Sequence, residues 1–347
     1  MSRLGIVAIG RNEGERLRRT LSSMVGHGYP VVYVDGNSSD GSPEVARSLG
    51  AEVLVEDPSG PTSAANGRNV GFERLCELDP EIRFVQFLDG DCVLVDGWLE
   101  RALGVFEERP DVALVTGRRR EEAPEASPYK KLADLEWDMP VGEVEVTHGD
   151  FMVRTEAFRQ AGGFDPLVLV SEDCELCIRL RKESHTLLRI GADMSLHDLP
   201  VTRFGQWWLR TKRTGYGYAD LARLHGKSPE RYNVREIRSA LFWGVALPVL
   251  ILGLAWWTRG ASFLLLGLYL VMYARIYRYA TGRGWSAPDA RLFARSCLIA
   301  KFPNALGIFT YWIRRLRRRQ LRNIEYRRAV TPSPQRELSA SISDDKN

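Results

Sequence analysis

Two aspartates separated by one glycine, Asp89 and Asp91, follow an apolar run from Phe84 to Leu88. The run has the pattern of a buried strand. Two adjacent carboxylates repel each other unless a cation lies between them, and the glycine allows a turn that brings both toward one ion. Ligands of open α/β sheets bind at the carboxyl ends of strands. The motif therefore predicts a divalent metal that holds a phosphorylated substrate; the alternative is an Asp-Gly turn.

A second acidic pair, Glu172 and Asp173, opens a predicted helix that continues to Lys182. Carboxylates at a helix N-terminus are favoured by the helix dipole and commonly act as caps. Here the pair follows a separate acidic site at a strand end. This arrangement favours a catalytic base at the start of the helix.

The elements that position these groups alternate regularly. Strands are expected at residues 3–10, 31–35, 51–56, 82–88 and 112–117, with helices between them. This alternation predicts a mostly parallel, doubly wound sheet. Neither G-x-G-x-x-G nor G-x-x-x-x-G-K-[ST] occurs, which excludes a dinucleotide fingerprint and a phosphate-loop NTPase. Residues 118–142 are charged and irregular, and are expected to form a mobile segment that borders the site.

Composition limits the possible partners. The 347 residues carry a formal net charge of +4, which does not indicate a polyanion-binding protein, and no nucleic-acid partner is expected. The five cysteines are irregularly spaced and suit a reducing compartment. Cys174 and Cys177 form a C-x-x-C without a second pair, so they are predicted to be core residues on a helix rather than zinc ligands.

Apolar residues concentrate late in the chain. Residues 241–257 and 261–273 are long enough, with flanking aromatic residues, for two transmembrane helices. Residues 286–312 are predicted to form an amphipathic interfacial helix, because Lys301 would be costly at the bilayer centre. The arginine cluster at 314–328 favours contact with anionic membrane lipids. Two crossings would leave these arginines and the preceding domain on the cytoplasmic face.

Several ordered motifs resemble those of the inverting family-2 glycosyltransferases, which have the GT-A fold. The resemblance covers about residues 3–218 and rests on these segments: Arg11-Asn12-Glu13, Val34 to Gly41, Gly67 to Gly71, Asp89-Gly90-Asp91, Arg154 to Phe158, Gly162 to Asp165, and Glu172-Asp173. Each segment is a weak signal, whereas their order along the chain is a strong one.

The resemblance implies a nucleotide-sugar site. Asp35 would lie near the base or ribose and Arg68 by the diphosphate, while Asp89 and Asp91 would be the D-x-D pair. Asp91 is the expected direct ligand of Mn²⁺ or Mg²⁺. His197 is a further candidate metal ligand, with a structural histidine as the equal alternative.

The resemblance also implies that Asp173 is the general base, supported by Glu172. Two departures qualify the match. Gly36 replaces a second aspartate after the second strand, so the identity of the nucleotide base is not indicated. The segment Gln206 to Arg210 lacks the Q-x-x-R-W spacing of processive synthases, which favours transfer of single sugars.

The sequence thus predicts a GT-A domain at residues 1–225, a linker or interfacial segment at 226–240, two transmembrane helices within 241–280, an interfacial helix and basic segment at 281–330, and a disordered tail at 331–347. The expected activity is metal-dependent transfer of one sugar from a nucleotide-diphosphate donor to a lipid-linked or polysaccharide acceptor. The alternatives are a polyprenyl-phosphate glycosyltransferase and a non-catalytic membrane scaffold of the same fold.

Overall fold

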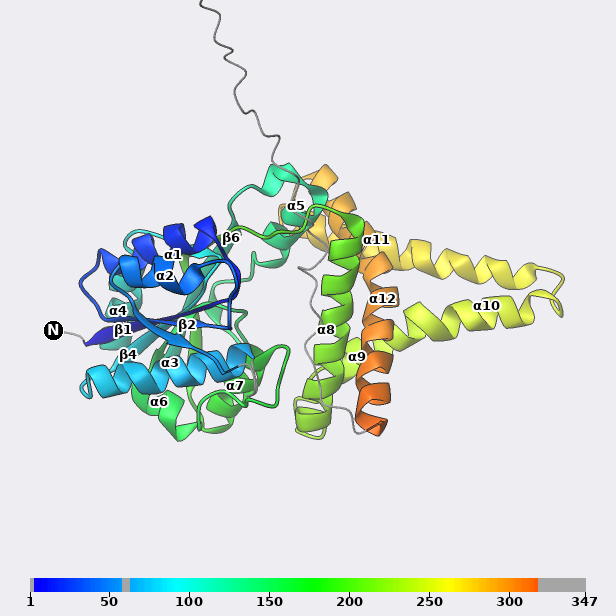
Figure 1. Cartoon of the computed structure of the whole chain (residues 1–347). Helices are drawn as coiled ribbons and strands as arrows, with labels where there is room; N and C mark the ends of the chain where they lie inside the picture. The colour runs from blue at the N-terminus through cyan, green and yellow to red at the C-terminus, as the bar shows by residue number, and fades with distance from the viewer. Residues whose placement is uncertain (1–2, 58–62, 318–347) are drawn as a thin grey trace, which may run out of the picture.

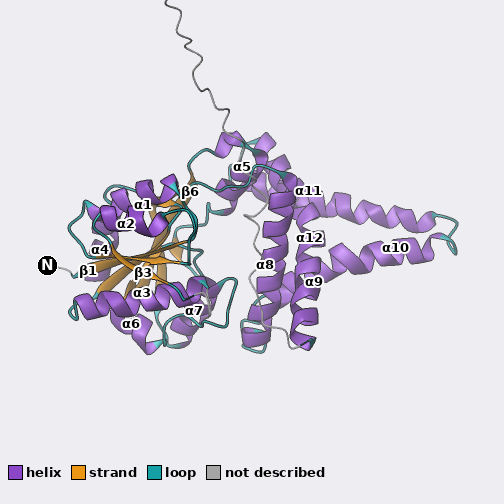
Figure 2. Ribbon diagram, in the orientation of Figure 1, coloured by secondary structure: helices purple, strands orange, loops and turns teal. Residues whose placement is uncertain are grey.

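The computed structural model describes residues 3–57 and 63–317. An α/β domain forms the N-terminal part, and a group of long helices follows it (Figures 1 and 2). The predicted tail at 331–347 and the basic residues 318–330 lie outside the described residues. The α/β domain carries every candidate site residue.

Nine strands form one mixed sheet in the order β3-β2-β1-β4-β8-β6-β9-β5, with β7 paired to β9. Their bounds are β1 Leu4–Gly10, β2 Val31–Asp35, β3 Glu52–Val55, β4 Phe84–Asp89, β5 Cys92–Leu94, β6 Val112–Glu121, β7 Gly142–Glu143, β8 Phe151–Arg154 and β9 Thr186–His197. The half from β3 to β4 is parallel, and β8 runs antiparallel to both β4 and β6. The sheet is therefore mostly parallel in its first half and mixed in its second.

Helices cover both faces of the sheet and then continue into the second part. Their bounds are α1 Glu15–Val25, α2 Ser42–Ser48, α3 Ala64–Leu78, α4 Trp98–Glu108, α5 Pro128–Glu136, α6 Thr155–Gln160, α7 Glu172–Lys182, α8 Phe204–His225, α9 Val234–Leu241, α10 Leu247–Ala255, α11 Gly267–Gly282 and α12 Ala287–Leu316. Short helical turns lie at Pro124–Ala126, Phe242–Ala246 and Ala261–Leu266.

Alternate residues of the central strand β1 face two separate cores. Ile6 and Ala8 pack with α1, α2 and α4 on one side, whereas Val7 packs with α3, α6 and α7 on the other. Figure 1 shows α1 and α2 above the sheet and α3, α6 and α7 below it. Because both faces are covered, the strand is apolar throughout, and its polar neighbours appear only where strands end.

Two local expectations were wrong. Residues 118–142 are not an irregular mobile segment: residues 118–121 continue β6, and residues 128–136 form α5, which contributes Leu132 and Ala133 to a small core with Trp207. The spacing of Asn12 and Glu15 predicts a capping box at the start of a helix, but Asn12 lies before α1 with φ 56°, and Gly14 occupies the cap position. The prediction for Cys174 and Cys177 is confirmed, since both are buried on α7.

Within the described residues, three helical stretches are long and apolar enough to cross a membrane: Val234–Ala255, Ala261–Gly282 and Ala287–Leu316. The first two form a hairpin that projects from the group of helices around α8 and α12, on the side away from the α/β domain (Figure 1). At the hairpin's tip Trp256 and Trp257 are 86% and 83% exposed. The third, α12, runs beside α8 and across the direction of the hairpin (Figure 1).

Glycines set how closely α8 and α12 approach. A Cβ on Gly307 of α12 would lie 2.0 Å from the carbonyl oxygen of Lys212, and one on Gly215 of α8 would lie 2.1 Å from that of Asn304. Both contacts are with backbone atoms, which cannot rotate away. The two helices therefore pack backbone to backbone, a geometry that small residues permit.

We expect Gly307→Ala to destabilise the helical region by about 1–3 kcal/mol, because overpacking a rigid contact costs about that much. The matched control is Gly253→Ala in α10, where an added Cβ would meet nothing within 4 Å. Thermal unfolding of both variants in the same detergent measures the difference. An equal melting temperature for the two would contradict the tight α8–α12 contact.

Candidate functional site

The motif Asp89-Gly90-Asp91 lies at the carboxyl end of β4, beside the end of β1. The Gly90 amide donates to the carbonyl oxygen of Ile9 (2.7 Å), and a Cβ at Gly90 would lie 2.9 Å from that oxygen. Gly90 is not among the residues with positive φ. The glycine is therefore required for close approach of two backbones rather than for an unusual turn.

The side chain of Asp89 lies between two arginines, Arg68 and Arg119. Its Oδ1 accepts from Arg68 (2.6 Å) and its Oδ2 from Arg119 (3.0 Å). Burial opposes ionisation of Asp89, but the guanidinium groups of Arg68 and Arg119 hold its pKa below the ordinary value. Asp89 is consequently an ionised carboxylate that holds the side chains of Arg68 and Arg119 in place at the end of β4.

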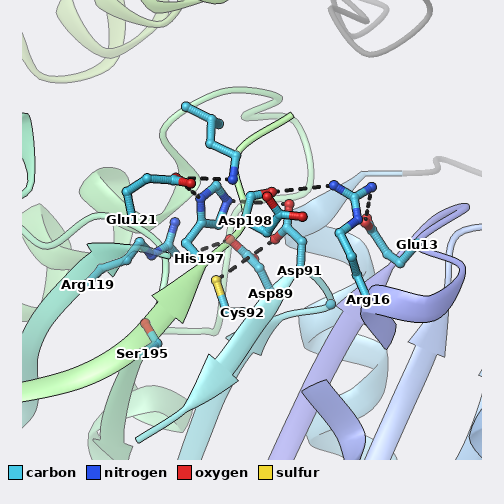
Figure 3. A network of polar contacts seen from close by, with 12 residues as sticks. Glu13, Arg16, Asp89, Asp91, Cys92, Arg119, Glu121, Ser195, His197 and Asp198 are labelled. Carbon is cyan, nitrogen blue, oxygen red and sulfur yellow. Dashed lines mark hydrogen bonds and ion pairs between the residues drawn. The ribbon is translucent and has the colours of Figure 1, made fainter. Parts of the chain in front are cut away.

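Asp91 faces His197 at the end of β9 (Figure 3). Its Oδ2 lies 3.4 Å from Nε2 of His197, and its Oδ1 lies 3.9 Å from Sγ of Cys92. Burial would lower the pKa of His197, yet Asp91 and Glu121 together raise it. One ligand atom each from Asp91, Cys92 and His197 fall within 4.8 Å of one another.

These groups fit a divalent cation. A carboxylate oxygen and an imidazole nitrogen are ligands that Mn²⁺ accepts, and carboxylate oxygens suit Mg²⁺. Burial raises the pKa of the Cys92 thiol well above its ordinary value, so Cys92 remains protonated and is the poorest ligand of the three. The fit therefore rests on Asp91 and His197, with the remaining positions open to a bound substrate.

Glu172 and Asp173 begin α7 and line the same cavity as these two groups. Asp173 Oδ2 accepts from the Gly149 amide (2.5 Å), and Glu172 Oε1 accepts from Arg68 (2.6 Å). Burial raises the pKa of Glu172, although Arg68 opposes the rise. Arg68 thus joins Glu172 to Asp89, so the two predicted acidic sites share one buried arginine.

Asp35 ends β2 and is fully buried. Its Oδ1 accepts from the Ser38 amide (2.6 Å), and its Oδ2 accepts from the Ser38 hydroxyl (2.6 Å) and from Tyr33 (3.0 Å). The Asn12 side chain accepts from the Ser39 amide (2.8 Å). Asp35 therefore fixes the loop after β2, and this loop is held against the loop after β1.

Two charged residues of this network, Asp150 and Arg119, were not identified from the sequence. Asp150, which is fully buried, accepts from Arg119 Nε (3.1 Å), from Ser195 (2.5 Å) and from the Asp89 amide (3.1 Å). Arg119 also stacks its guanidinium over Trp137, 5.6 Å from the ring centroid. A signal was present at Asp150, which precedes the apolar strand Phe151–Arg154, but nothing local indicated Arg119.

A single cavity of about 2840 Å³ connects these groups. Among the predicted site residues, those on its wall are Arg68, Asp89, Asp91, Glu172, Asp173 and His197. Asp35 is not on the wall, although its neighbours Val34 and Gly36 are. The cavity continues between the α/β domain and helices α8 and α12, so its second end is formed by the long helices.

The fold and this acidic, arginine-bridged cavity define a glycosyltransferase of the GT-A class. The chain matches the family described as glycosyl transferase family 2 over residues 6–160. It also matches glycosyl transferase family group 2 over residues 84–280, and this second match alone covers more than half of the chain. The protein therefore belongs to the family-2 glycosyltransferases.

Curated relatives include two glycosyltransferases. The chain is 31% identical over 230 residues to the pre-mycofactocin glycosyltransferase of Mycobacterium tuberculosis, with 62% of this chain and 46% of that protein covered. It is 25% identical over 247 residues to the glycosyltransferase AglE of Haloferax volcanii, with 67% and 76% covered. The chain thus spans about half the length of the mycobacterial relative.

A solved structure supports the fold assignment. The mannosyltransferase PcManGT from Pyrobaculum calidifontis, in complex with GDP-Man and Mn²⁺, aligns with a TM-score of 0.57 at 15% identity. The alignment covers 89% of this chain and 87% of that one. The likeness therefore includes helices beyond the α/β domain.

Proposed function

We propose that the protein transfers a single sugar, with inversion, from a nucleotide-diphosphate sugar to an acceptor held at the membrane. The observation that carries the proposal is one continuous cavity that Asp91, His197 and Asp173 all line. Membership of the glycosyltransferase family supplies the reaction class.

On the donor side, Asp91 and His197 would hold Mn²⁺ or Mg²⁺, with Asp89 close by. When bound, such an ion neutralises charge that develops on a departing diphosphate. Asp35 would act at the nucleotide end by fixing the loop after β2. Arg68 lies on the cavity wall between Asp89 and Glu172, where it would offset the negative charge of these carboxylates beside a bound diphosphate.

On the acceptor side, Asp173 would take the proton from the attacking hydroxyl. The Gly149 and Cys174 amides donate to its two oxygens and so fix the orientation of the carboxylate. A single base opposite the departing diphosphate suits direct displacement at C1, which inverts the configuration. Glu172, paired with Arg68, would support this base from the adjacent position.

We further propose that the α10–α11 hairpin enters the bilayer from the cytoplasmic side, while α12 lies at the interface. The hairpin begins at α9, which packs against α8 and α12, and at its returning end Arg283 after α11 donates to the Asp138 carbonyl of the α/β domain. Arg275 and Arg278 lie toward this returning end, and Arg314 and Arg315 lie in the last turn of α12. This charge distribution fits the positive-inside rule.

The test is a thermal-shift screen of the full-length protein with UDP-, GDP- and dTDP-sugars, with and without Mn²⁺. Binding to the folded state stabilises it by mass action, by about 2.7 kcal/mol at a ligand concentration of 100 times Kd. We expect one nucleotide class to stabilise the protein only when Mn²⁺ or Mg²⁺ is present. Absence of any metal-dependent stabilisation across the panel would favour the non-catalytic scaffold instead.

A further inference from the structure

The second end of the cavity is rich in cations. The basic residues on its wall that come from the long helices are Arg210, Arg213, Arg223, Lys301, Arg314 and Arg315. Arg210 pairs with Glu136 (3.2 Å) and Arg223 with Asp220 (3.0 Å), and the long helices also place one acid, Glu236, on this wall. Cations therefore outnumber acids along this wall, which favours an anionic group; Lys301 and Arg314 lie about 20 Å apart along α12, so Lys301 is a separate position from Arg314 and Arg315.

Helix α12 has two chemically different faces. The residues that it contributes to the cavity wall are Phe293, Ser296, Cys297, Ala300, Lys301, Asn304, Arg314 and Arg315. The large apolar residues that it exposes elsewhere are Ile299, Phe302, Leu306, Phe309, Trp312, Ile313 and Leu316. The exposed residues from 299 to 313 recur at three- and four-residue spacing, which marks one face of a helix. That face suits the acyl boundary of a membrane, and the other faces the cavity.

Two polar side chains on the cavity face lack partners within the described part of the chain. Asn304 is 8% exposed, and its Oδ1 has no hydrogen bond. Lys301, one turn earlier, forms no ion pair and no hydrogen bond with residues 3–57 or 63–317, although acid–base pairs are common elsewhere in the molecule. A buried amide oxygen without a partner is costly. Glu236 is close enough to act on the charge of Lys301 but forms no ion pair with it, so an ammonium that can still pair indicates a place for an anionic ligand.

We propose that this end of the cavity, at Lys301 and Asn304, binds the phosphate group of a lipid-linked acceptor. The inference rests on the proposed function and names the acceptor class for that same cavity. The lipid's chain would lie along the apolar face of α12, and its phosphate would reach Lys301. The ammonium and the Asn304 Nδ2–H group would donate charge-assisted hydrogen bonds to the phosphate oxygens, and the unpartnered Asn304 Oδ1 would accept from a hydroxyl of the group that the phosphate carries.

The transfer step uses a hydroxyl on the group that the phosphate carries. The bond between sugar C1 and the donor's diphosphate oxygen breaks, and its electron pair stays on the diphosphate. A new C1–O bond forms to the acceptor hydroxyl, whose proton passes to Asp173. Asp173, Arg213 and Lys301 all line this one cavity, so the base and the proposed anchor border the same space. The lipid phosphate is thus an anchor and is chemically unchanged.

The experiment measures binding of farnesyl phosphate, farnesyl diphosphate, farnesol and inorganic diphosphate to the full-length protein in neutral detergent. We expect the two phosphorylated lipids to bind at least tenfold more tightly than farnesol or inorganic diphosphate. Lys301→Met should weaken binding of the phosphorylated lipids about tenfold, a loss that corresponds to one charge-assisted contact. Lys301→Arg should retain most of the affinity.

The matched control is Arg291→Met, because Arg291 is also a cation on α12 but is not on the cavity wall. Both methionine variants should retain metal-dependent binding of the nucleotide sugar, which reports on the donor end alone. Equal lipid binding by Lys301→Met and wild type, or equal binding of farnesol and farnesyl phosphate, would overturn the anchor. Inorganic diphosphate binding as tightly as the lipids would show an anion site without a lipid. If the wild-type protein bound no nucleotide sugar in the presence of metal, the proposed function itself would be overturned.

Discussion

Asp91→Ala is expected to lower the rate of sugar transfer by about 10³-fold or more, because a bound metal supplies several kcal/mol of charge stabilisation and each 1.36 kcal/mol changes a rate about tenfold. Asp91 ends the loop after β4 with its Oδ2 3.4 Å from His197. Removing its carboxylate leaves His197 as the remaining one of the two groups that would hold the divalent ion. The fold should survive, since the side chain contributes no apolar packing to the two cores.

Three measurements make this prediction specific. Asp91→Asn, which keeps the shape of the side chain, should lose activity as fully as Asp91→Ala. Asp96→Ala is the control, because Asp96 is an exposed carboxylate five positions later that forms no hydrogen bond or ion pair with the described residues. The metal-dependent thermal shift with the nucleotide sugar should disappear in both Asp91 variants and persist in the control. Near-normal transfer by Asp91→Ala would remove Asp91 from the metal site.

The strand ends were the most predictable part of the molecule. The apolar run before Asp89 and the acidic start of α7 are local patterns, so both elements appear where the sequence placed them. Their convergence on one cavity follows from parallel strands, whose carboxyl ends share an edge. The mixed half of the sheet was not predictable in the same way, because β8 and β9 pair across long sequence separations.

The charge network around Asp89 shows what a linear sequence hides. Arg119 lies in β6, 30 residues after Asp89, and Asp150 precedes β8, 61 residues after it. Their pairing depends on the strand order β4-β8-β6, which no local pattern encodes. Asp35 differs in another way: the strand end was predicted, yet its carboxylate points into the loop that follows rather than to the cavity.

The prediction of a mobile segment at residues 118–142 was wrong because tertiary packing orders this segment. Their charge and prolines indicated a mobile loop, but Lys130 is buried and bridges Glu121 (2.9 Å) and Asp198 (2.7 Å). Those ion pairs balance the charge that the sequence seemed to leave exposed. The segment is thereby built into the wall beside His197, whose Nδ1 lies 3.7 Å from Glu121.

Asp173→Asn is expected to reduce transfer to a hydroxyl acceptor by about 10²–10⁴-fold, the usual contribution of a positioned general base. An asparagine can still accept from the Cys174 amide, so α7 should keep its first turn. Donor binding with Mn²⁺ should be unchanged, because the carboxylates at the donor end remain. The control is Glu183→Gln, which neutralises an exposed carboxylate at the other end of α7.

The same variant separates the two acceptor chemistries. An acceptor hydroxyl must lose its proton as the new C1–O bond forms, whereas an acceptor phosphate oxygen is already ionised and needs no base. If Asp173→Asn retains transfer within about tenfold of wild type, a polyprenyl phosphate would be the attacking group and Lys301 would hold the nucleophile itself. If transfer falls by 10²-fold or more while donor binding persists, Asp173 is the base and the phosphate at Lys301 is an anchor. The buried carboxylate, oriented by the Gly149 and Cys174 amides, favours the second result.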